Sequence, residues 1–598
     1  MALDIVRLLE CSSWQAFDVD DAGRVLAGSD ESGSVQLAEL ADGATTALTA
    51  LPGAVSGRYL PGERVVVVQH DSDGDERSQL SLLRLDEPRA PMRPVVHDRR
   101  YVHRLLDVLP GRIVYMTNRR NGVDFDVVVR DAATGEERVV YDRGGMVLDA
   151  RASPDGRVAV AVPASKPLSD QILLVDNAGE VVPLTDPDEH ARHTHLCWLP
   201  DGSGLVVTTN AGRDFTGIAR IGPGGDRSWL VTSDEHDLTG WPSPDGSTLL
   251  VQANVEGAAR FALHEPTGEL RREVGLPDDG WCAFPLPAPV WSPGSRFAAL
   301  SFSGPRVPGD ALLLPADGPV RALTSSAAQL GPAPVAPSVH RVPTPDGELI
   351  PCFVYSPPDP PPEVAGSSVL ILHGGPEAQA VQSFSPIVQA LVGQGHTVLV
   401  PNVRGSTGYG KRWYSADDVR RRLSAVDDLA ALHDWLPALG LDPARAALWG
   451  GSYGGYLVLA GLAFQPARWA AGVDVVGISS LVTFLENTAA YRRAHREREY
   501  GSLTADADFL REVSPLTRAD RIAAPLFVLH GANDPRVPLS EAEQLAEAVR
   551  AKGIECELLV YPDEGHGLAK RVNRLDAYPR ALDFLLRNLR ARVASPAP

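Results

Sequence analysis

One serine in this chain lies in a setting that could make it a nucleophile. The motif Gly450-Gly451-Ser452-Tyr453-Gly454-Gly455 follows the apolar run 446–449 and precedes the helix-compatible segment 456–464. A strand, a Gly-x-Ser-x-Gly turn and a helix together form a nucleophile elbow, in which the serine sits on a sharp turn. Glycines are needed around it so that strand and helix can approach each other closely. We therefore expect Ser452 to attack a substrate carbonyl.

Two further side chains could complete a catalytic triad. Asp534 follows the predicted strand 526–529, and His566 follows the predicted strand 557–561, 32 residues later. The order Ser, Asp, His, with each residue just past a strand end, is that of α/β-hydrolases. In such a triad the histidine takes the serine proton, and the aspartate orients the imidazole and stabilises its charged form. The sequence thus predicts Ser452, Asp534 and His566 as the catalytic residues.

Nearby residues fit these roles less well. Asp563 and Glu564 are too close to His566 along the chain to reach behind its ring. His530 precedes the predicted acid at a buried strand end and is interpreted as a packing residue.

An acyl-transfer site also needs donors for the developing oxyanion. The backbone N–H of Tyr453, the residue after the nucleophile, is the first expected donor. The loop His373-Gly374-Gly375-Pro376-Glu377 follows an early strand, and its glycines allow close approach of the backbone. We expect Gly375 to supply the second N–H, although a glycine turn without a catalytic role is the alternative.

Three other patterns suggest ligand sites on first inspection. Gly405 to Lys411 fits the start of a phosphate-binding loop, but Arg412 replaces the hydroxyl that would hold Mg²⁺. His190, His193 and His195 lack a carboxylate or cysteine to complete a metal site, and a surface loop is favoured. The acids at 71, 73, 75 and 76 lack calcium-loop spacing, which favours a hairpin turn. We expect no metal and no cofactor.

The N-terminal half contains a repeat that predicts a β-propeller. Turn glycines recur at positions 23, 62, 111, 156, 202, 246 and 294, each before an apolar strand. The spacing of roughly 45 residues matches a four-stranded propeller blade. The sequence therefore predicts seven blades over residues 1–328, with a pair of β-sandwiches as the alternative.

From about residue 329 the pattern changes to that of an α/β domain. Strand-like runs alternate with longer amphipathic helices, which indicates a mostly parallel sheet flanked by helices. We expect an α/β-hydrolase domain over residues 329–598.

Composition limits the classes of partner and location. The chain has 598 residues and a formal net charge of −20, which argues against nucleic acid and against an anionic membrane surface. Its five cysteines, Cys11, Cys197, Cys282, Cys352 and Cys556, are scattered and form no C-x-x-C pair, as expected for free thiols in a reducing compartment. No signal peptide or membrane span is visible. We expect a cytoplasmic protein, and the composition leaves self-association into a homo-oligomer open.

These motifs together resemble the prolyl oligopeptidase family of serine peptidases, and in particular its acylaminoacyl-peptidase branch. The resemblance is most specific in His373 to Pro376, Asn402 to Gly410, Gly450 to Tyr456, Asn533 to Pro538 and Gly565-His566-Gly567. It implies peptidase activity on short peptides, with a propeller that covers the active site. It also implies that Arg536 holds a substrate carbonyl on the N-terminal side of the scissile bond; a salt bridge that braces the Asp534 loop is the alternative.

The pocket for the side chain before the scissile bond is less well defined. Tyr453 and the segment after Val475 should line it, and Leu481, Phe484 and Tyr491 are the candidates. A carboxylate among the charged residues 486–499 could bind a free substrate amine, although a solvated helix face explains most of these charges. The paired glutamates with which dipeptidyl peptidases bind free amines are not recognisable.

The sequence thus favours a serine peptidase that acts near the N-terminus of short peptides, of acylaminoacyl-peptidase, oligopeptidase or aminopeptidase type. A hydrolase of a small aminoacyl amide or ester is the first alternative, because function depends on the pocket rather than on the fold. A propeller binding protein with an inactive hydrolase domain is the alternative from another class.

Overall fold

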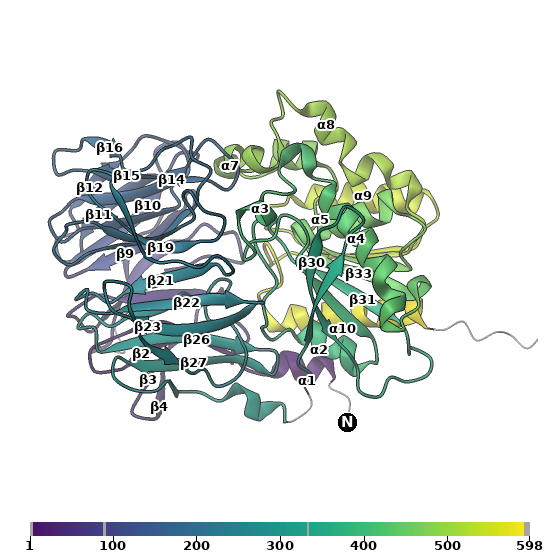
Figure 1. The fold of residues 1–598 in the computed structure, drawn as a ribbon, viewed down its shortest axis with the longest axis horizontal. Helices are drawn as coiled ribbons and strands as arrows, with labels where there is room; N and C mark the ends of the chain where they lie inside the picture. Colours follow the sequence, from purple (N-terminus) through teal and green to yellow (C-terminus); the bar gives the residue numbers. More distant parts are fainter. Residues whose placement is uncertain (1–3, 88–90, 332–333, 591–598) are drawn as a thin grey trace, which may run out of the picture.

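The computed structural model describes residues 4–87, 91–331 and 334–590. Figure 1 shows a propeller beside an α/β unit. Within the described residues the propeller contains seven four-stranded antiparallel sheets, which confirms the seven predicted blades. The first four blades are β1 (Trp14–Val19), β2 (Val25–Ser29), β3 (Gln36–Ala41), β4 (Ala44–Ala47); β5 (Val55–Tyr59), β6 (Val65–His70), β7 (Gln79–Arg84), β8 (Arg93–Val96); β9 (His103–Leu109), β10 (Arg112–Thr117), β11 (Asp126–Asp131), β12 (Glu137–Tyr141); and β13 (Asp149–Ala152), β14 (Val158–Pro163), β15 (Asp170–Val175), β16 (Val181–Pro183). The last three are β17 (His193–Trp198), β18 (Leu205–Thr209), β19 (Gly217–Ile221), β20 (Arg227–Val231); β21 (Leu238–Pro242), β22 (Leu249–Val255), β23 (Ala258–His264), β24 (Leu270–Val274); and β25 (Val290–Trp291), β26 (Phe297–Gly304), β27 (Val307–Pro315), β28 (Arg321–Ala322).

The repeated glycine turns join the first two strands of the blades. In blade four the amide of Gly156 donates to Ser153 O at 3.0 Å, and Gly156 has a φ of 97° that favours glycine. Blade one is built entirely from the start of the propeller sequence and blade seven entirely from its end. Because the two blades share no strand, the ring closes through side-chain contacts between them. At this junction Ser301 Oγ accepts the amide of Ala16 at 2.9 Å and donates to its carbonyl at 3.1 Å.

The α/β unit is built on an eight-stranded sheet in the order β29-β30-β32-β31-β33-β34-β35-β36. The pairs β29/β30 and β30/β32 are antiparallel, and the other neighbours are parallel, as the sequence predicted for most of the sheet. The strands are β29 (Ser338–Pro343), β30 (Leu349–Tyr355), β31 (Ser368–Leu372), β32 (Thr397–Pro401), β33 (Ala446–Gly451), β34 (Ala471–Val475), β35 (Leu526–Gly531) and β36 (Cys556–Tyr561).

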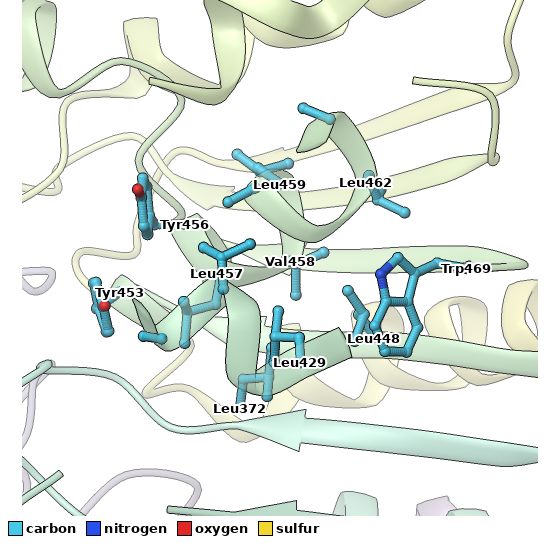
Figure 2. Close-up of a cluster of buried hydrophobic side chains, with 14 of the residues drawn as sticks. Leu372, Leu429, Leu448, Tyr453, Tyr456, Leu457, Val458, Leu459, Leu462 and Trp469 are labelled. Carbon is cyan, nitrogen blue, oxygen red and sulfur yellow. The ribbon is translucent and has the colours of Figure 1, made fainter. Parts of the chain in front are cut away.

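Helices cover both faces of this sheet. The α-helices are α1 (Ile5–Glu10), α2 (Pro386–Gly393), α3 (Lys411–Tyr414), α4 (Ser424–Trp435), α5 (Tyr453–Phe464), α6 (Leu481–Asn487), α7 (Ala490–Tyr500), α8 (Ala507–Glu512), α9 (Leu539–Ala551) and α10 (Arg571–Leu589). Successive side chains of a strand point to opposite faces, so Leu526 and Val528 pack with α4, α5 and α9, while Phe527 and Leu529 pack with α1, α2 and α10. Helix α5 is apolar all round and lies in the core, as Figure 2 shows for Leu457, Val458 and their neighbours.

The N-terminal helix departs from the predicted boundary at residue 328. Helix α1 buries Ile5, Leu8 and Leu9 in the same apolar cluster as α2 and α10, so this segment belongs structurally to the α/β unit. In Figure 1 the purple helix α1 accordingly lies beside α2. The sequence did not predict this contact, because a segment of six residues is too short for its apolar pattern to indicate which distant helices it packs against.

All five cysteines are free thiols, and four of them are buried, whereas Cys197 is half-buried. In the part of the chain that the structure describes, no helix has both the length and the apolar character that crossing a bilayer requires.

Candidate active site

The three predicted triad residues lie at one edge of the sheet. Strands β33, β34, β35 and β36 are parallel neighbours, so their carboxyl ends meet at the same edge. Ser452 follows β33, Asp534 lies in the loop after β35, and His566 lies in the loop after β36. The topology thus brings together three residues that are far apart in sequence.

The elbow around Ser452 has the strained geometry that its sequence predicts. Ser452 has φ 59° and ψ −118°, which is unfavourable for a residue with a side chain. A Cβ on Gly450 would lie 2.2 Å from Gly454 O, and one on Gly455 would lie 2.3 Å from Asp474 Oδ1. These glycines are therefore required by close contacts between strand β33, helix α5 and the neighbouring strand β34.

Asp534 and His566 form the hydrogen bond that a triad needs. His566 Nδ1 lies 2.7 Å from Asp534 Oδ2, and Asp534 is 9% exposed. The other oxygen, Asp534 Oδ1, accepts the amides of Arg536 at 2.8 Å and Val537 at 3.1 Å. Since an ionised carboxylate can only accept, Nδ1 carries the proton and Nε2 is left as an acceptor.

Ser452 Oγ, in contrast, makes no side-chain hydrogen bond with any described residue. Its amide donates to Val475 O at 2.8 Å, which holds the elbow against β34. The structure therefore joins two members of the triad by a hydrogen bond and leaves the serine hydroxyl free.

The rejected neighbours do not compete for His566. His530 is fully buried, its Nε2 lies 3.0 Å from Val537 O, and burial lowers its pKa. Asp563 pairs with Lys570 at 2.8 Å, and Glu564 accepts the amides of the next turn. All three residues hold loops in place.

The glycine loop after β31 lies against the elbow. A Cβ on Gly374 would be 3.4 Å from Ser452 Cβ, so the loop passes directly beside the nucleophile. Gly375 has a φ of 130°, and a Cβ there would lie 2.6 Å from the amide nitrogen of Glu377. His373 braces the loop, because its Nδ1 lies 2.8 Å from Gly374 O and its Nε2 lies 2.8 Å from Ser406 Oγ. Gly375 thus stays a prediction as an oxyanion donor, on a loop that reaches the nucleophile.

Beneath the elbow lies a buried ionic network that sequence reasoning missed. Arg422 is fully buried and pairs with Asp417 and Glu499. Tyr453 donates its hydroxyl to Asp417 Oδ2 at 2.8 Å, and the Arg422 guanidinium lies 5.2 Å from the Tyr453 ring centroid and 4.9 Å from that of Tyr500. Burial raises the pKa of Asp417 and that of Glu499 to about 7. The network therefore holds the residue whose N–H is the first expected oxyanion donor.

Asp417, Glu499 and the neighbouring Asp418 also form an acidic cluster that could hold a cation. The guanidinium of Arg422 already lies among these carboxylates, so we assign no metal site there. Glu499 was one of the charges attributed mostly to a solvated helix face, but it is 2% exposed. The helix α7 that carries it faces the propeller, and no local pattern in the sequence could reveal that contact.

The three pocket candidates separate into two groups. Leu481 and Phe484 are buried in the same cluster as Tyr453, and the Phe484 ring lies 5.7 Å from that of Tyr500. Tyr491 instead packs edge-on against Phe125 of the propeller, with ring centroids 5.7 Å apart. The structure thus places Leu481 and Phe484 in the buried cluster that includes Tyr453, and Tyr491 at the domain interface.

Arg536 forms an ion pair with the propeller. Its Nε lies 2.5 Å from Glu76 Oε1, and the same carboxylate pairs with Arg492 of α7. Glu76 lies in the loop between β6 and β7, which we call the blade-two loop (residues 71–78). The same loop contacts the His566 loop, where Lys570 Nζ lies 2.8 Å from Asp73 Oδ1. The acids interpreted as a hairpin turn do lie in a hairpin, and they also connect the two domains.

The two remaining patterns have structural roles. The segment that resembles a phosphate-binding loop contacts blade five, where Lys411 Nζ donates to Asn210 O at 3.1 Å. The surface loop expected for the three histidines is wrong for His193 and His195, which lie on β17, and His193 is buried. His190 packs against Tyr414 and His195 against Trp241. Among the described residues, these histidines are not part of a group that could hold a metal ion.

Comparisons with known proteins agree with this geometry. Residues 382–592 match the model of the prolyl oligopeptidase family. The chain is 41% identical over 211 residues to dipeptidyl aminopeptidase BIII of Pseudoxanthomonas mexicana, a match that covers 34% of this chain and 31% of that protein. It is 28% identical over 222 residues to acylamino-acid-releasing enzyme 1 of Oryza sativa subsp. japonica, covering 35% of this chain and 28% of that protein. The chain thus matches about a third of the length of these curated relatives.

Solved structures match over nearly the whole chain. A puromycin-hydrolyzing peptidase of Mycobacterium tuberculosis superposes with a TM-score of 0.85 at 22% identity, covering 98% of this chain and 96% of that chain. The acylaminoacyl peptidase of Pyrococcus horikoshii superposes with a TM-score of 0.74 at 16% identity, covering 100% and 99%. At these identities the likeness shows the fold, namely a propeller with an α/β-hydrolase unit. The comparisons thus place residues 382–592 within the model of the prolyl oligopeptidase family and give the whole chain the fold of these structures.

Proposed function

We propose that this protein is a serine peptidase that cleaves short peptides near their N-terminus through an acyl-enzyme. The observation that carries the proposal is the 2.7 Å contact between His566 Nδ1 and Asp534 Oδ2, at the sheet edge where Ser452 lies on a strained elbow. Matches of about a third of the chain to named peptidases support it.

In this mechanism Ser452 is the nucleophile and His566 is the general base. Nε2 of His566 accepts the hydroxyl proton as Ser452 Oγ bonds to the substrate carbonyl carbon, and the imidazolium then donates that proton to the leaving amine. Asp534 stays ionised and stabilises the imidazolium. Water activated by the same histidine then releases the acid product. Substrate binding would have to bring Ser452 Oγ and Nε2 together, as catalytic hydrogen bonds often tighten only in the complex.

The tetrahedral oxyanion would be stabilised by the amides of Tyr453 and Gly375. Each such donor contributes about 2.7–4 kcal/mol to transition-state stabilisation. The Arg422 network beneath Tyr453 would keep the first donor in place. Leu481 and Phe484 would form part of the apolar pocket for the residue before the scissile bond.

The N-terminal group of the substrate would meet Arg536. We propose that its guanidinium holds a substrate carbonyl, because it offers several donors and keeps its charge. Glu76 is already shared by Arg536 and Arg492, so a free α-ammonium would have to displace an arginine to reach it. This favours peptides with a blocked N-terminus over those with a free one.

A hydrolase of small aminoacyl amides is the second candidate. The whole-chain likeness to a structure named a puromycin-hydrolyzing peptidase favours it. Rates on N-acetyl-aminoacyl, free aminoacyl and simple ester chromogenic substrates would separate the two candidates.

The active serine is tested by fluorophosphonate labelling of the purified protein. Labelling should map to Ser452, and Ser452→Ala should abolish it and lower kcat by roughly 10⁶. Near-normal turnover of Ser452→Ala would refute the assignment. An unlabelled wild-type protein would favour a binding protein with an inactive hydrolase domain. A cytoplasmic location and self-association stay predictions from the sequence.

A further inference from the structure

The innermost strand of each blade lines the central channel of the propeller, and one arginine there is unusual. Arg104 is the second residue of β9, at the end of blade three that faces the α/β unit. The same end holds the loop before β11, where Phe125 contacts Tyr491 of α7. The Arg104 side chain is solvent-exposed, yet desolvation is the strongest influence on its pKa and lowers it. Arg104 is thus a solvent-exposed guanidinium at the end of blade three that faces the α/β unit.

The charged groups nearest to Arg104 leave it without a partner. They are Asp149, Arg492, Glu76 and Arg536. Asp149 lies 3.2 Å from Arg151 Nε, and Glu76 is shared by the two other arginines. In the described part of the chain Arg104 itself has no ion pair and no side-chain hydrogen bond, although a guanidinium offers five donors. Of the three guanidiniums in this group, Arg492 and Arg536 share Glu76, and Arg104 has no carboxylate partner of its own among the described residues.

The other acids of the blade-two loop do not fill this role. Asp73 pairs with Lys570 at 2.8 Å, and Asp75 accepts the amide of Arg77 within its own loop at 3.0 Å. Asp71 is half-buried in the loop, and burial raises its pKa to about 6. Within the described residues, none of these acids forms an ion pair with Arg104.

We propose that Arg104, with Arg492 beside it, binds a substrate carboxylate on the N-terminal side of the scissile bond. This rests on the proposed function, in which Arg536 holds a carbonyl on that side. Because Arg104 lies within electrostatic reach of Arg536, the group it meets belongs to the second or third residue before the bond. The favoured substrates are short peptides with an acidic residue, or a dicarboxylic acyl group, at that place. Guanidinium and carboxylate form paired, charge-assisted hydrogen bonds, which makes arginine suited to this recognition.

The test compares peptide p-nitroanilides that differ only at the N-terminus. The succinyl, acetyl and free-amine forms of one dipeptide or tripeptide are cleaved by wild type and by Arg104→Gln, at 20 mM and 300 mM NaCl. At low salt the wild type should cleave the succinyl form with a kcat/KM about tenfold above that of the acetyl form. The ratio should shrink at high salt, because ions screen a partly solvated contact.

Arg104→Gln should bring the succinyl-to-acetyl ratio close to one and leave the acetyl rate within about twofold of wild type. Arg104→Lys should retain part of the preference. Arg112→Gln is the matched control, because Arg112 lies on β10 opposite Leu109, at the far end of the hairpin in which Arg104 lies opposite Met116. It should leave the ratio unchanged.

Two results would overturn the inference while the proposed function stands. One is a succinyl-to-acetyl ratio that Arg104→Gln does not change. The other is a loss of activity in Arg104→Gln that depends on a free C-terminal carboxylate of the substrate instead, measured by comparing an acetylated peptide with its C-terminal amide. If the wild type cleaves none of these compounds, the proposed function fails and this inference fails with it.

Discussion

Gly454 provides the sharpest test of the elbow geometry. It is the second residue of α5, where the helix passes over the end of β31. A Cβ at this position would lie 2.1 Å from Leu372 O and 2.9 Å from His373 O. Both contacts are with backbone atoms at the end of a buried strand, which cannot rotate away as a flexible side chain could.

The size of the effect follows from this overlap. Gly454→Ala must move the start of α5 by about 1 Å, and overpacking of this kind costs about 1–3 kcal/mol or more. For a unit of this size the melting temperature should fall by about 2–4 °C per kcal/mol. The displaced segment includes Ser452 and the amide of Tyr453, and a shift of about 1 Å can slow catalysis about 100-fold.

The assay combines thermal unfolding with the rate of fluorophosphonate labelling of Ser452. Gly451→Ala is the matched control, because a Cβ on Gly451 would lie 3.7 Å from Val475 O, an ordinary contact. The control should melt and label close to wild type, while Gly454→Ala should melt earlier and label far more slowly, or fail to fold. Equal behaviour of the two variants, with Gly454→Ala close to wild type, would refute the steric account of the motif.

Three further predictions concern buried and interdomain charges. Arg422→Met leaves two buried carboxylates without their cation and should cost about 3–5 kcal/mol of stability. Its control is Arg420→Met, at an arginine whose side chain is 63% exposed, which should cost less than about 1 kcal/mol. Equal melting temperatures of the two variants would contradict a stabilising role of the Arg422 network. Burial raises the pKa of Asp474 to about 8, so its contribution to stability is complete below the unfolded pKa near 4 and is lost as the pH rises to about 8. Asp474→Asn should therefore reduce the fall in melting temperature between pH 5.5 and 8.5, and an unchanged fall would show that other groups cause it. Arg536→Ala should lower kcat/KM on blocked peptides by roughly 10- to 150-fold, because it removes a charged hydrogen bond worth about 1.5–3 kcal/mol. Glu76→Gln should leave kcat/KM nearly unchanged. Equal losses in the two variants would mean that Arg536 only braces the interface.

Local sequence was enough for the elbow because its constraints are steric and lie within a few residues. The close contact of Gly450 with Gly454 requires glycine wherever a strand turns sharply into a helix around a serine. The blade repeat was readable for the same reason, since each turn and its strands lie within about 45 residues. The parallel order of β33, β35 and β36 then places Asp534 and His566 at the edge where Ser452 lies.

The contacts between the domains were decided by the tertiary structure alone. Glu76 and Arg536 are 460 positions apart. From the sequence the acids around Glu76 are interpreted as a hairpin turn, and only the structure shows that the α/β unit lies against them. The charges of helix α7 indicate a surface helix, yet its Glu499 pairs with Arg422 in the Arg422 network and its Arg492 pairs with Glu76 of the propeller. Periodicity and turn chemistry describe how a segment folds locally, but they contain no information about which distant surface covers it. The sequence therefore determined the two folds and the three candidate triad residues, whereas the structure decided which charges meet between them.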